Sequence, residues 1–134
     1  MEPAAPSPAG PPGYIDGFVH PVPTDRLDAY RRLVGAVAAI WREHGALDYQ
    51  EFIGDDMALE GTRPFPDIVG SSDDETIVFG WVLFESREAR DLANRKVAAD
   101  PRVAELIERA DSGFDPSRMG YGGFRPLVPA GGEG

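Results

Sequence analysis

A carboxylate and an imidazole lie close together on one predicted strand near the start of the sequence. Residues 14–20 alternate as a strand does, so Asp16 and His20 share a strand face. Asp is depleted in strands, and a carboxylate beside an imidazole can act as a general acid and base. In a purely structural reading, Asp16 bonds a neighbouring strand or an interface Arg, and His20 lies at the solvated strand end. Both readings stay open, and Asp16 and His20 are the candidate catalytic residues.

Further polar side chains are predicted to gather near a tryptophan. Tyr49 and Glu51 share a face of the second predicted strand, and Tyr121 shares a face of the last strand with Arg125. Beside Trp81 these groups would form a pocket with apolar walls and few polar anchors, which suits a small-molecule ligand. A salt bridge between Glu51 and Arg125 at a sheet edge explains them at least as well. These five residues are the candidate ligand-binding residues.

The sequence offers no support for a metal site or a nucleophile. The two histidines, His20 and His44, are distant in sequence, cysteine is absent, and the carboxylates are scattered through acidic turns. No serine lies in a nucleophile-elbow pattern. The glycines around Tyr121 do not link a strand to a helix, so they do not form a phosphate loop. We expect no metal and no cofactor.

Charge and composition restrict the partners of the protein. The 134 residues carry a formal net charge of −10, which opposes binding to nucleic acid and to anionic membranes. No apolar run approaches the ~20 residues that span a bilayer, and the first residues lack the pattern of a secretory signal. We therefore expect an acidic cytoplasmic protein that binds neither nucleic acid nor membrane.

The longest apolar run, residues 76–84, is the predicted central strand. Its β-branched and aromatic residues are apolar on both faces, with Trp81 on one and Val82 on the other. Both faces of the sheet therefore need cover. The helices of so short a chain cover one face, so we expect a second copy to cover the other, as a homodimer.

Helix ends are marked by capping residues. Thr24 is the expected N-cap of a helix that ends at Gly45. Ser86 is the expected N-cap of a second helix, and Asp100 followed by Pro101 starts a third, shorter one. The apolar stripes are Leu27, Tyr30, Val34, Val37 and Trp41 in the first helix and Ala89, Leu92, Ala93 and Val97 in the second.

Prolines and glycines set the predicted limits of strands and loops. Residues 21–23, Pro-Val-Pro, should end the first strand, because proline has no N–H to give to a ladder. Residues 55–66 predict a long loop, followed by a short extended piece over residues 66–71. Three glycines in residues 119–128 predict a bulge or the close approach of another chain. The predicted strands are residues 14–20, 47–53, 76–84 and 119–128.

The order of these elements, βαββαβ, predicts an α+β fold of the ferredoxin-like type. In this plan one antiparallel sheet carries its helices on one face. Two such sheets packed face to face would form a dimeric α+β barrel. The predicted domain spans residues 14–128, between a disordered Pro- and Ala-rich tail over residues 1–13 and a flexible tail over residues 129–134.

Several short motifs, which occur in order and at suitable spacings, carry a family resemblance. They are residues 14–19, 21–23, 41–47, 54–56, 74–76, 94–97, 100–102 and 118–124. Together they resemble the YbaA-like family of small bacterial proteins of unknown function. The resemblance covers about residues 14–128 and implies a ferredoxin-like, dimeric α+β-barrel fold. It implies no activity and supplies no catalytic residues.

Two functions fit this sequence. The first is a small-molecule-binding protein or a cofactor-independent enzyme, such as an oxygenase or isomerase, with a pocket between sheet and helices. The alternative is a non-catalytic homodimeric binding or interaction module. The first requires a cavity reached by Trp81 and by at least one of Asp16, His20 and Glu51. A solid core, with Asp16 and Arg125 paired across an interface, would favour the module.

Overall fold

Four antiparallel strands form one sheet in the order β2-β3-β1-β4. The computed structural model describes residues 13–128, so residues 1–12 and 129–134, which hold nearly all of the two predicted tails, lie outside the described residues. With a helix after β1 and helices after β3, the order of elements is that of the ferredoxin-like plan. The predicted α+β fold is confirmed. The strands are β1 (Tyr14–Pro23), β2 (Asp48–Ile53), β3 (Glu75–Phe84) and β4 (Gly120–Phe124).

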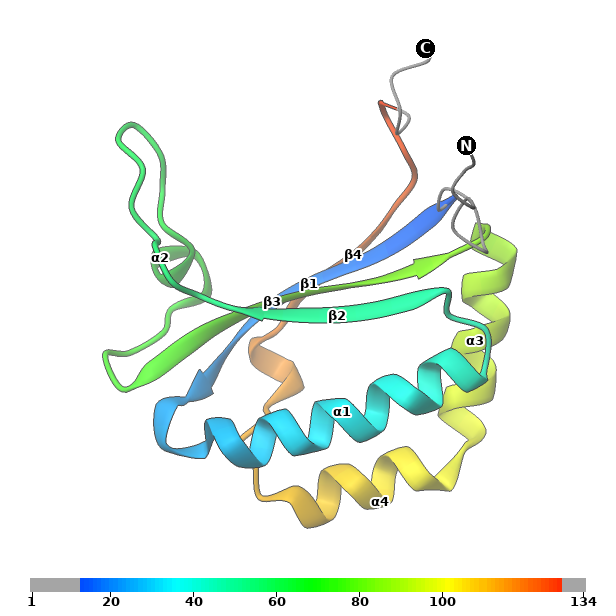
Figure 1. Ribbon diagram of the computed structural model, residues 1–134. Coiled ribbons are helices and arrows are strands. Elements are labelled where there is room, and N and C mark those ends of the chain that lie inside the picture. The colour runs from blue at the N-terminus through cyan, green and yellow to red at the C-terminus, as the bar shows by residue number, and fades with distance from the viewer. Residues whose placement is uncertain (1–12, 129–134) are drawn as a thin grey trace, which may run out of the picture.

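Three helices cover one face of this sheet (Figure 1). They are α1 (Leu27–Glu43), α3 (Arg87–Ala99) and α4 (Pro101–Ala110). A short helix, α2 (Phe65–Val69), lies on the opposite side, within the long connection between β2 and β3. Single turns of 3-10 helix precede α1 (Thr24–Arg26) and β4 (Pro116–Arg118). In the described part of the chain, no helix is both long and apolar enough to cross a bilayer.

The predicted helix caps are mostly confirmed. Ser86 accepts a hydrogen bond from the Ala89 N–H at 3.0 Å and so caps α3. Asp100 caps α4 in the same way, with Pro101 at its first position. The prediction for Thr24 was wrong, because the chain first makes a 3-10 turn there. The Thr24 hydroxyl instead hydrogen-bonds the Thr76 hydroxyl on β3, at 3.0 Å.

Strand β1 continues through Pro21 and Pro23, beyond its predicted end. Just after the strand, the Thr24 N–H donates to the Asp74 carbonyl at 2.9 Å, so the even-numbered positions of this stretch donate toward β3. The nitrogens of the two prolines therefore face the other side. Pairing with β4 has already ended there, at Val19. The prolines fit because no N–H is required at this edge.

Two further predictions need correction. Residues 66–71 are not extended, because α2 runs through them and ends at Gly70, whose φ of 70° is left-handed. The last strand is shorter than predicted and ends at Phe124, before Pro126. Its pairing with β1 is continuous and shows no bulge. Gly123 is small because Tyr14 and Arg90 approach it, with a Cβ there lying 3.0 Å from the Arg90 Nη1.

Alternation along the strands separates two faces of the sheet. On the helix side, a Cβ at Gly80 would lie 2.5 Å from the Phe18 ring and 2.9 Å from the Glu51 Cγ, so this position leaves room for both side chains. Pairs opposite each other on this side are Asp16 and Val82, Phe18 and Gly80, and His20 and Val78.

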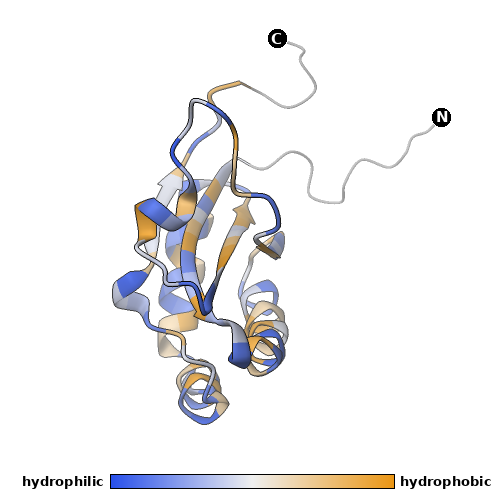
Figure 2. Ribbon diagram, turned by 90° about the vertical axis from the view of Figure 1, so that its left-hand side faces the viewer, coloured by the Kyte–Doolittle hydropathy of each residue, from blue (hydrophilic) through white to orange (hydrophobic). Residues whose placement is uncertain are grey.

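The other side of the sheet is apolar and uncovered by helices α1, α3 and α4. Its central residues, which we call the bare face, are Phe52, Phe79, Trp81 and Phe124. Phe65 of α2 packs against Phe79, with ring centroids 6.3 Å apart, but 43% of Phe79 stays exposed. Figure 2 shows hydrophobic residues along the strands of the sheet. The prediction of helical cover on one face is therefore confirmed.

Candidate functional site

A cavity of about 460 Å³ lies between the helix side of the sheet and the three large helices. Apolar side chains make up most of its wall, and a few polar groups from the strands and α1 reach it. This is the usual character of a small-molecule site. The apolar walls include Phe18, Val37, Trp41, Val82, Val103 and Phe114. The principal polar groups are Asp16, His20, Tyr30, Tyr49, Glu51 and Tyr121.

Four of these polar groups are joined by hydrogen bonds, and we call them the histidine network: His20, Tyr30, Glu51 and Tyr49. The His20 Nε2 lies 2.9 Å from the Tyr30 hydroxyl. The Tyr30 hydroxyl donates a short hydrogen bond to one oxygen of Glu51. The Tyr49 hydroxyl donates to the other oxygen at 2.8 Å. The network thus leads from β1 through α1 to β2.

Burial shifts the pKa of each group in the histidine network. It lowers the pKa of His20, although the backbone of Pro21 opposes the shift, so the neutral imidazole is favoured. Burial raises the pKa of Glu51, although the two phenols stabilise its charged form. The pKa values of Tyr30 and Tyr49 are raised by burial and by the charge of Glu51, so both phenols remain donors.

One nitrogen of His20 has no partner. With Glu51 ionised and the Tyr30 hydroxyl donating a hydrogen bond to it, the Nε2 of neutral His20 is the donor in its contact with Tyr30. Nδ1 then carries a lone pair. His20 is 1% exposed, and Nδ1 makes no hydrogen bond with any of residues 13–128. A buried acceptor without a partner is costly, so a bound molecule that reached Nδ1 would gain by giving it a hydrogen bond.

A second cluster, the arginine network, is centred on Arg90 of α3. The Arg90 Nη1 donates to Asp16 at 2.7 Å and to the Tyr121 hydroxyl at 2.8 Å. Its Nε donates to Asp91 at 2.9 Å, and its guanidinium lies 4.9 Å from the centroid of the Tyr14 ring. Burial, together with Asp16, raises the pKa of Tyr121 to about 12. The hydrogen bond from Arg90 pairs the buried carboxylate of Asp16 with a cation.

The cavity brings together most of the residues predicted from the sequence. Asp16, His20, Tyr49, Glu51 and Tyr121 all line it. Asp16 does not bond His20, because Arg90 holds it in the arginine network. His20 is buried, rather than at the solvated end of its strand.

Two predicted ligand-binding residues lie elsewhere. Trp81 belongs to the bare face, where its ring packs against Phe52 with centroids 6.0 Å apart. Odd-numbered positions of β3 face away from the helices, so the cavity wall at this point is Val82. Arg125 follows the end of β4 and is exposed. The cavity has a tryptophan all the same, Trp41 of α1.

Sequence reasoning missed two residues that connect the polar groups. Tyr30 was read as part of the apolar stripe of α1, and its ring does pack there, but its hydroxyl links His20 to Glu51. Arg90 is spaced with Ala93 and Val97 on the buried side of α3, a helical spacing that could have identified it. Leu92, predicted to face inward, is 44% exposed.

The chain resembles known proteins along most of its length. The uncharacterized protein YbaA of Escherichia coli strain K12 is 39% identical over 115 residues, which cover 86% of this chain and 97% of that protein. The uncharacterized protein YbaA of Shigella flexneri matches with the same identity and coverage.

A solved structure shares the fold. It is a monooxygenase from the gene ActVA-Orf6 of Streptomyces coelicolor, in complex with the ligand nanaomycin D. The TM-score is 0.51 at 22% sequence identity, and the match covers 86% of this chain and 88% of the other. A likeness at this identity supports the fold, whereas activity depends on the residues of the site.

A family model provides the assignment. The model described as a protein of unknown function, DUF1428, matches residues 13–116. Among residues 13–128, no group of three or more His, Cys, Asp or Glu side chains could hold a metal ion. The family match and the two YbaA relatives confirm the resemblance found in the sequence. The chain belongs to the DUF1428 family of proteins of unknown function.

Proposed function

We propose that this protein binds an aromatic, largely apolar small molecule in the cavity and that His20 accepts a proton or a hydrogen bond from it. The observation that carries this proposal is the unpartnered Nδ1 of a buried histidine on the wall of a cavity. The reaction class that follows is proton removal from an acidic O–H or C–H group. This step begins a cofactor-independent reaction of the oxygenase or isomerase type.

The walls of the cavity support an aromatic ligand. Phe18, Trp41 and Phe114 offer ring faces and edges, and aromatic groups pack favourably against both. The volume, about 460 Å³, lies within the range of roughly 300–1,000 Å³ that is common for ligand sites. The shared fold of the Streptomyces monooxygenase makes oxygenation a reaction class to test, although the proposal does not depend on it.

The bare face supports a homodimer as part of this proposal. Aromatic side chains are rarely left exposed together on a monomer, and an identical bare face is a complementary cover of matching polarity. The alternative function, a non-catalytic homodimeric module, uses this face alone. It differs from our proposal in leaving the cavity without a ligand.

Native mass spectrometry of the freshly purified protein separates the two functions. We expect a dimer that carries a discrete extra mass. Binding is then measured in a Trp81→Phe background, where Trp41 on the cavity wall is the remaining tryptophan and its fluorescence reports occupancy. A panel of naphthols and naphthoquinones serves as probe, and we expect quenching that saturates.

A matched pair of variants tests whether the probe lies in the cavity. Val37→Phe fills part of the cavity and should weaken probe binding at least tenfold, whereas Val69→Phe on α2, outside the cavity, should not change it. Equal binding by both variants would place the probe elsewhere. A dimer with no extra mass and no probe binding would favour the module.

A further inference from the structure

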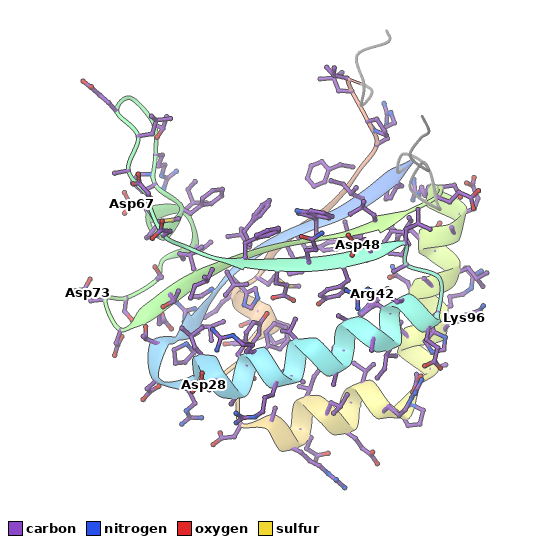
Figure 3. The ribbon with its side chains drawn as sticks, in the orientation of Figure 1. Asp28, Arg42, Asp48, Asp67, Asp73 and Lys96 are labelled. Atoms are coloured by element: carbon purple, nitrogen blue, oxygen red, sulfur yellow. The ribbon has the colours of Figure 1, made fainter. Side chains whose placement is uncertain are left out.

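Glu51 stands between the cavity and a second hollow on the surface. This groove, of about 370 Å³, runs between α1 and the edge strand β2 and is bordered by exposed residues such as Arg31 and Phe52. Figure 3 shows Arg42 of α1 near Asp48 at the start of β2, where its Nη2 donates to the Tyr49 carbonyl at 3.1 Å. Arg42 and Tyr49 both line the groove, so this hydrogen bond joins its two sides.

Three members of the histidine network border both hollows. Tyr30, Tyr49 and Glu51 line the cavity as well as the groove. His20 lines the cavity only, and it connects to this partition through its Nε2 contact with Tyr30. A continuous line of hydrogen bonds thus leads from a buried base in the cavity to a carboxylate at the groove.

We propose that His20, Tyr30 and Glu51 form a proton relay from a ligand in the cavity to the groove beside β2. The relay rests on the proposed function, since it needs a ligand that gives up a proton. Glu51 is the terminal acceptor, and Tyr30 is the bridge. Tyr49 lies off the path and holds the second oxygen of Glu51.

Each step of the relay conserves protons and charge. The ligand hydroxyl gives its proton to His20 Nδ1, while the Nε2 proton passes to the Tyr30 oxygen. The Tyr30 proton passes to Glu51 along its existing hydrogen bond. The result is a ligand anion and a neutral Glu51, with His20 and Tyr30 again neutral. Solvent in the groove then takes the proton from Glu51.

The surroundings favour this direction of transfer. Burial raises the pKa of Glu51, so it holds a proton more readily than an exposed carboxylate. The other ionisable groups at the cavity, Asp16 and Tyr121, are bonded to Arg90 in the arginine network, so Asp16 is not a competing free base.

The test uses 2-naphthol as a proton-donating probe and 2-methoxynaphthalene as a probe of similar shape that has no proton to give. On excitation 2-naphthol becomes a strong acid, so the ratio of naphtholate to naphthol emission from the bound probe reports how readily it passes its proton to an acceptor. In the wild type we expect clear naphtholate emission from the bound probe at neutral pH. Glu51→Gln, which lacks the terminal acceptor, and Tyr30→Phe, which lacks the bridge, should each lower this emission ratio about tenfold.

The sign of the Glu51→Gln effect separates a relay from simple electrostatics. Without a relay, removing a negative charge near the ligand would favour the naphtholate and raise the emission ratio. Tyr49→Phe leaves the path from His20 to Glu51 intact and should keep the ratio close to that of the wild type. A raised ratio in Glu51→Gln, or a loss in Tyr49→Phe as large as that in Tyr30→Phe, would overturn the relay.

The two probes also separate failure of the relay from failure of the proposed function. If neither naphthalene binds, the cavity proposal fails. If both bind and the emission ratio of bound naphthol is the same in the wild type, Glu51→Gln and Tyr30→Phe, the cavity stands and the relay does not.

A measurement without ligand tests the starting state. NMR of the nitrogen-labelled imidazoles distinguishes the two neutral tautomers, and His44→Gln assigns the signals because the chain has only two histidines. We expect the Nε2–H tautomer for His20. An Nδ1–H tautomer in the wild type would contradict the relay even if the substituted proteins failed to fold.

Discussion

The guanidinium of Arg90 ties α3 to the middle of the sheet through Asp16 of β1 and Tyr121 of β4. Replacing Asp16 by Ala would leave this cation buried without its strongest partner. We expect the free energy of unfolding to fall by about 3 kcal/mol, measured by urea denaturation. Asp91→Ala removes a half-exposed partner of the same Arg90 and should cost less than about 1 kcal/mol. Equal losses in the free energy of unfolding would show that Asp16 stabilises the fold no more than Asp91 does.

A second residue-scale prediction concerns pH. Hydrogen bonds from Arg118, just before β4, and from Ser72 lower the pKa of Glu75 to about 2. A lowered folded-state pKa gives stability that is present above the unfolded pKa and is lost as pH falls toward the folded one. Between pH 4.5, near the ordinary pKa of a glutamate, and about pH 2, the free energy of unfolding of the wild type should therefore fall more steeply than that of Glu75→Gln. Urea denaturation measures this free energy at each pH. If it fell in parallel for the two proteins over this pH range, the prediction would be contradicted.

At this scale the sequence identified the polar side chains inside strands, but not the residues to which they are hydrogen-bonded. Asp16, His20 and Glu51 were found because polar groups inside strands are conspicuous. Their partners Tyr30 and Arg90 lie on helices, and helix-to-strand contacts follow from packing that a periodic pattern does not contain. Arg90 also reaches its partners with a long side chain, so its reach cannot be read from spacing alone.

At the scale of elements, the cap of α3 offers a clean test. Ser86→Ala removes the hydrogen bond to the Ala89 N–H and should cost about 1 kcal/mol in the free energy of unfolding. Ser117→Ala, in an exposed turn, should stay within about 0.5 kcal/mol. Urea denaturation measures both, and a loss no larger for Ser86 than for Ser117 would show that the cap contributes little.

Two of the element boundaries that the sequence missed share a physical cause. Each involves a proline or glycine whose effect depends on the neighbouring strand or turn. Pro21 and Pro23 would end a strand paired on both sides, but β1 is paired on one side there. Pro66 fits the first turn of α2 as well as it fits an extended segment. Whether β1 is paired on one side or on both at Pro21 and Pro23 depends on the order of strands in the sheet, which is a tertiary property.

At the scale of the whole molecule, the bare face predicts the assembly. Phe79→Glu places a charge in the middle of this face and should convert the proposed dimer to a monomer in light scattering. Leu92→Glu on α3 is a matched control, since Leu92 is 44% exposed and Phe79 43%, and it should leave the dimer intact. A wild-type monomer, or a dimer broken equally by both substitutions, would contradict a dimer through the sheet.

The fold itself was accessible from the sequence because long periodic segments and the order βαββαβ leave few topologies. The sequence suggested a pocket between sheet and helices, but not its size or its full lining, which depend on how far the three helices stand from the sheet. The misplacement of Trp81 has a simpler origin. The alternation correctly put Trp81 and Val82 on opposite faces of one strand, but it did not say which face the helices cover.

Alternation along β1 and β3 also bears on how such a protein can diverge. Even-numbered positions such as Phe18 and Val82 touch the cavity, while odd-numbered ones such as Phe79 and Trp81 form the bare face. Residues next to each other in the sequence therefore belong to different surfaces, the cavity wall and the bare face. A lineage that changes the even positions can reshape the cavity while its bare face stays the same. Relatives with altered cavities and unaltered bare faces are the expected record of that history.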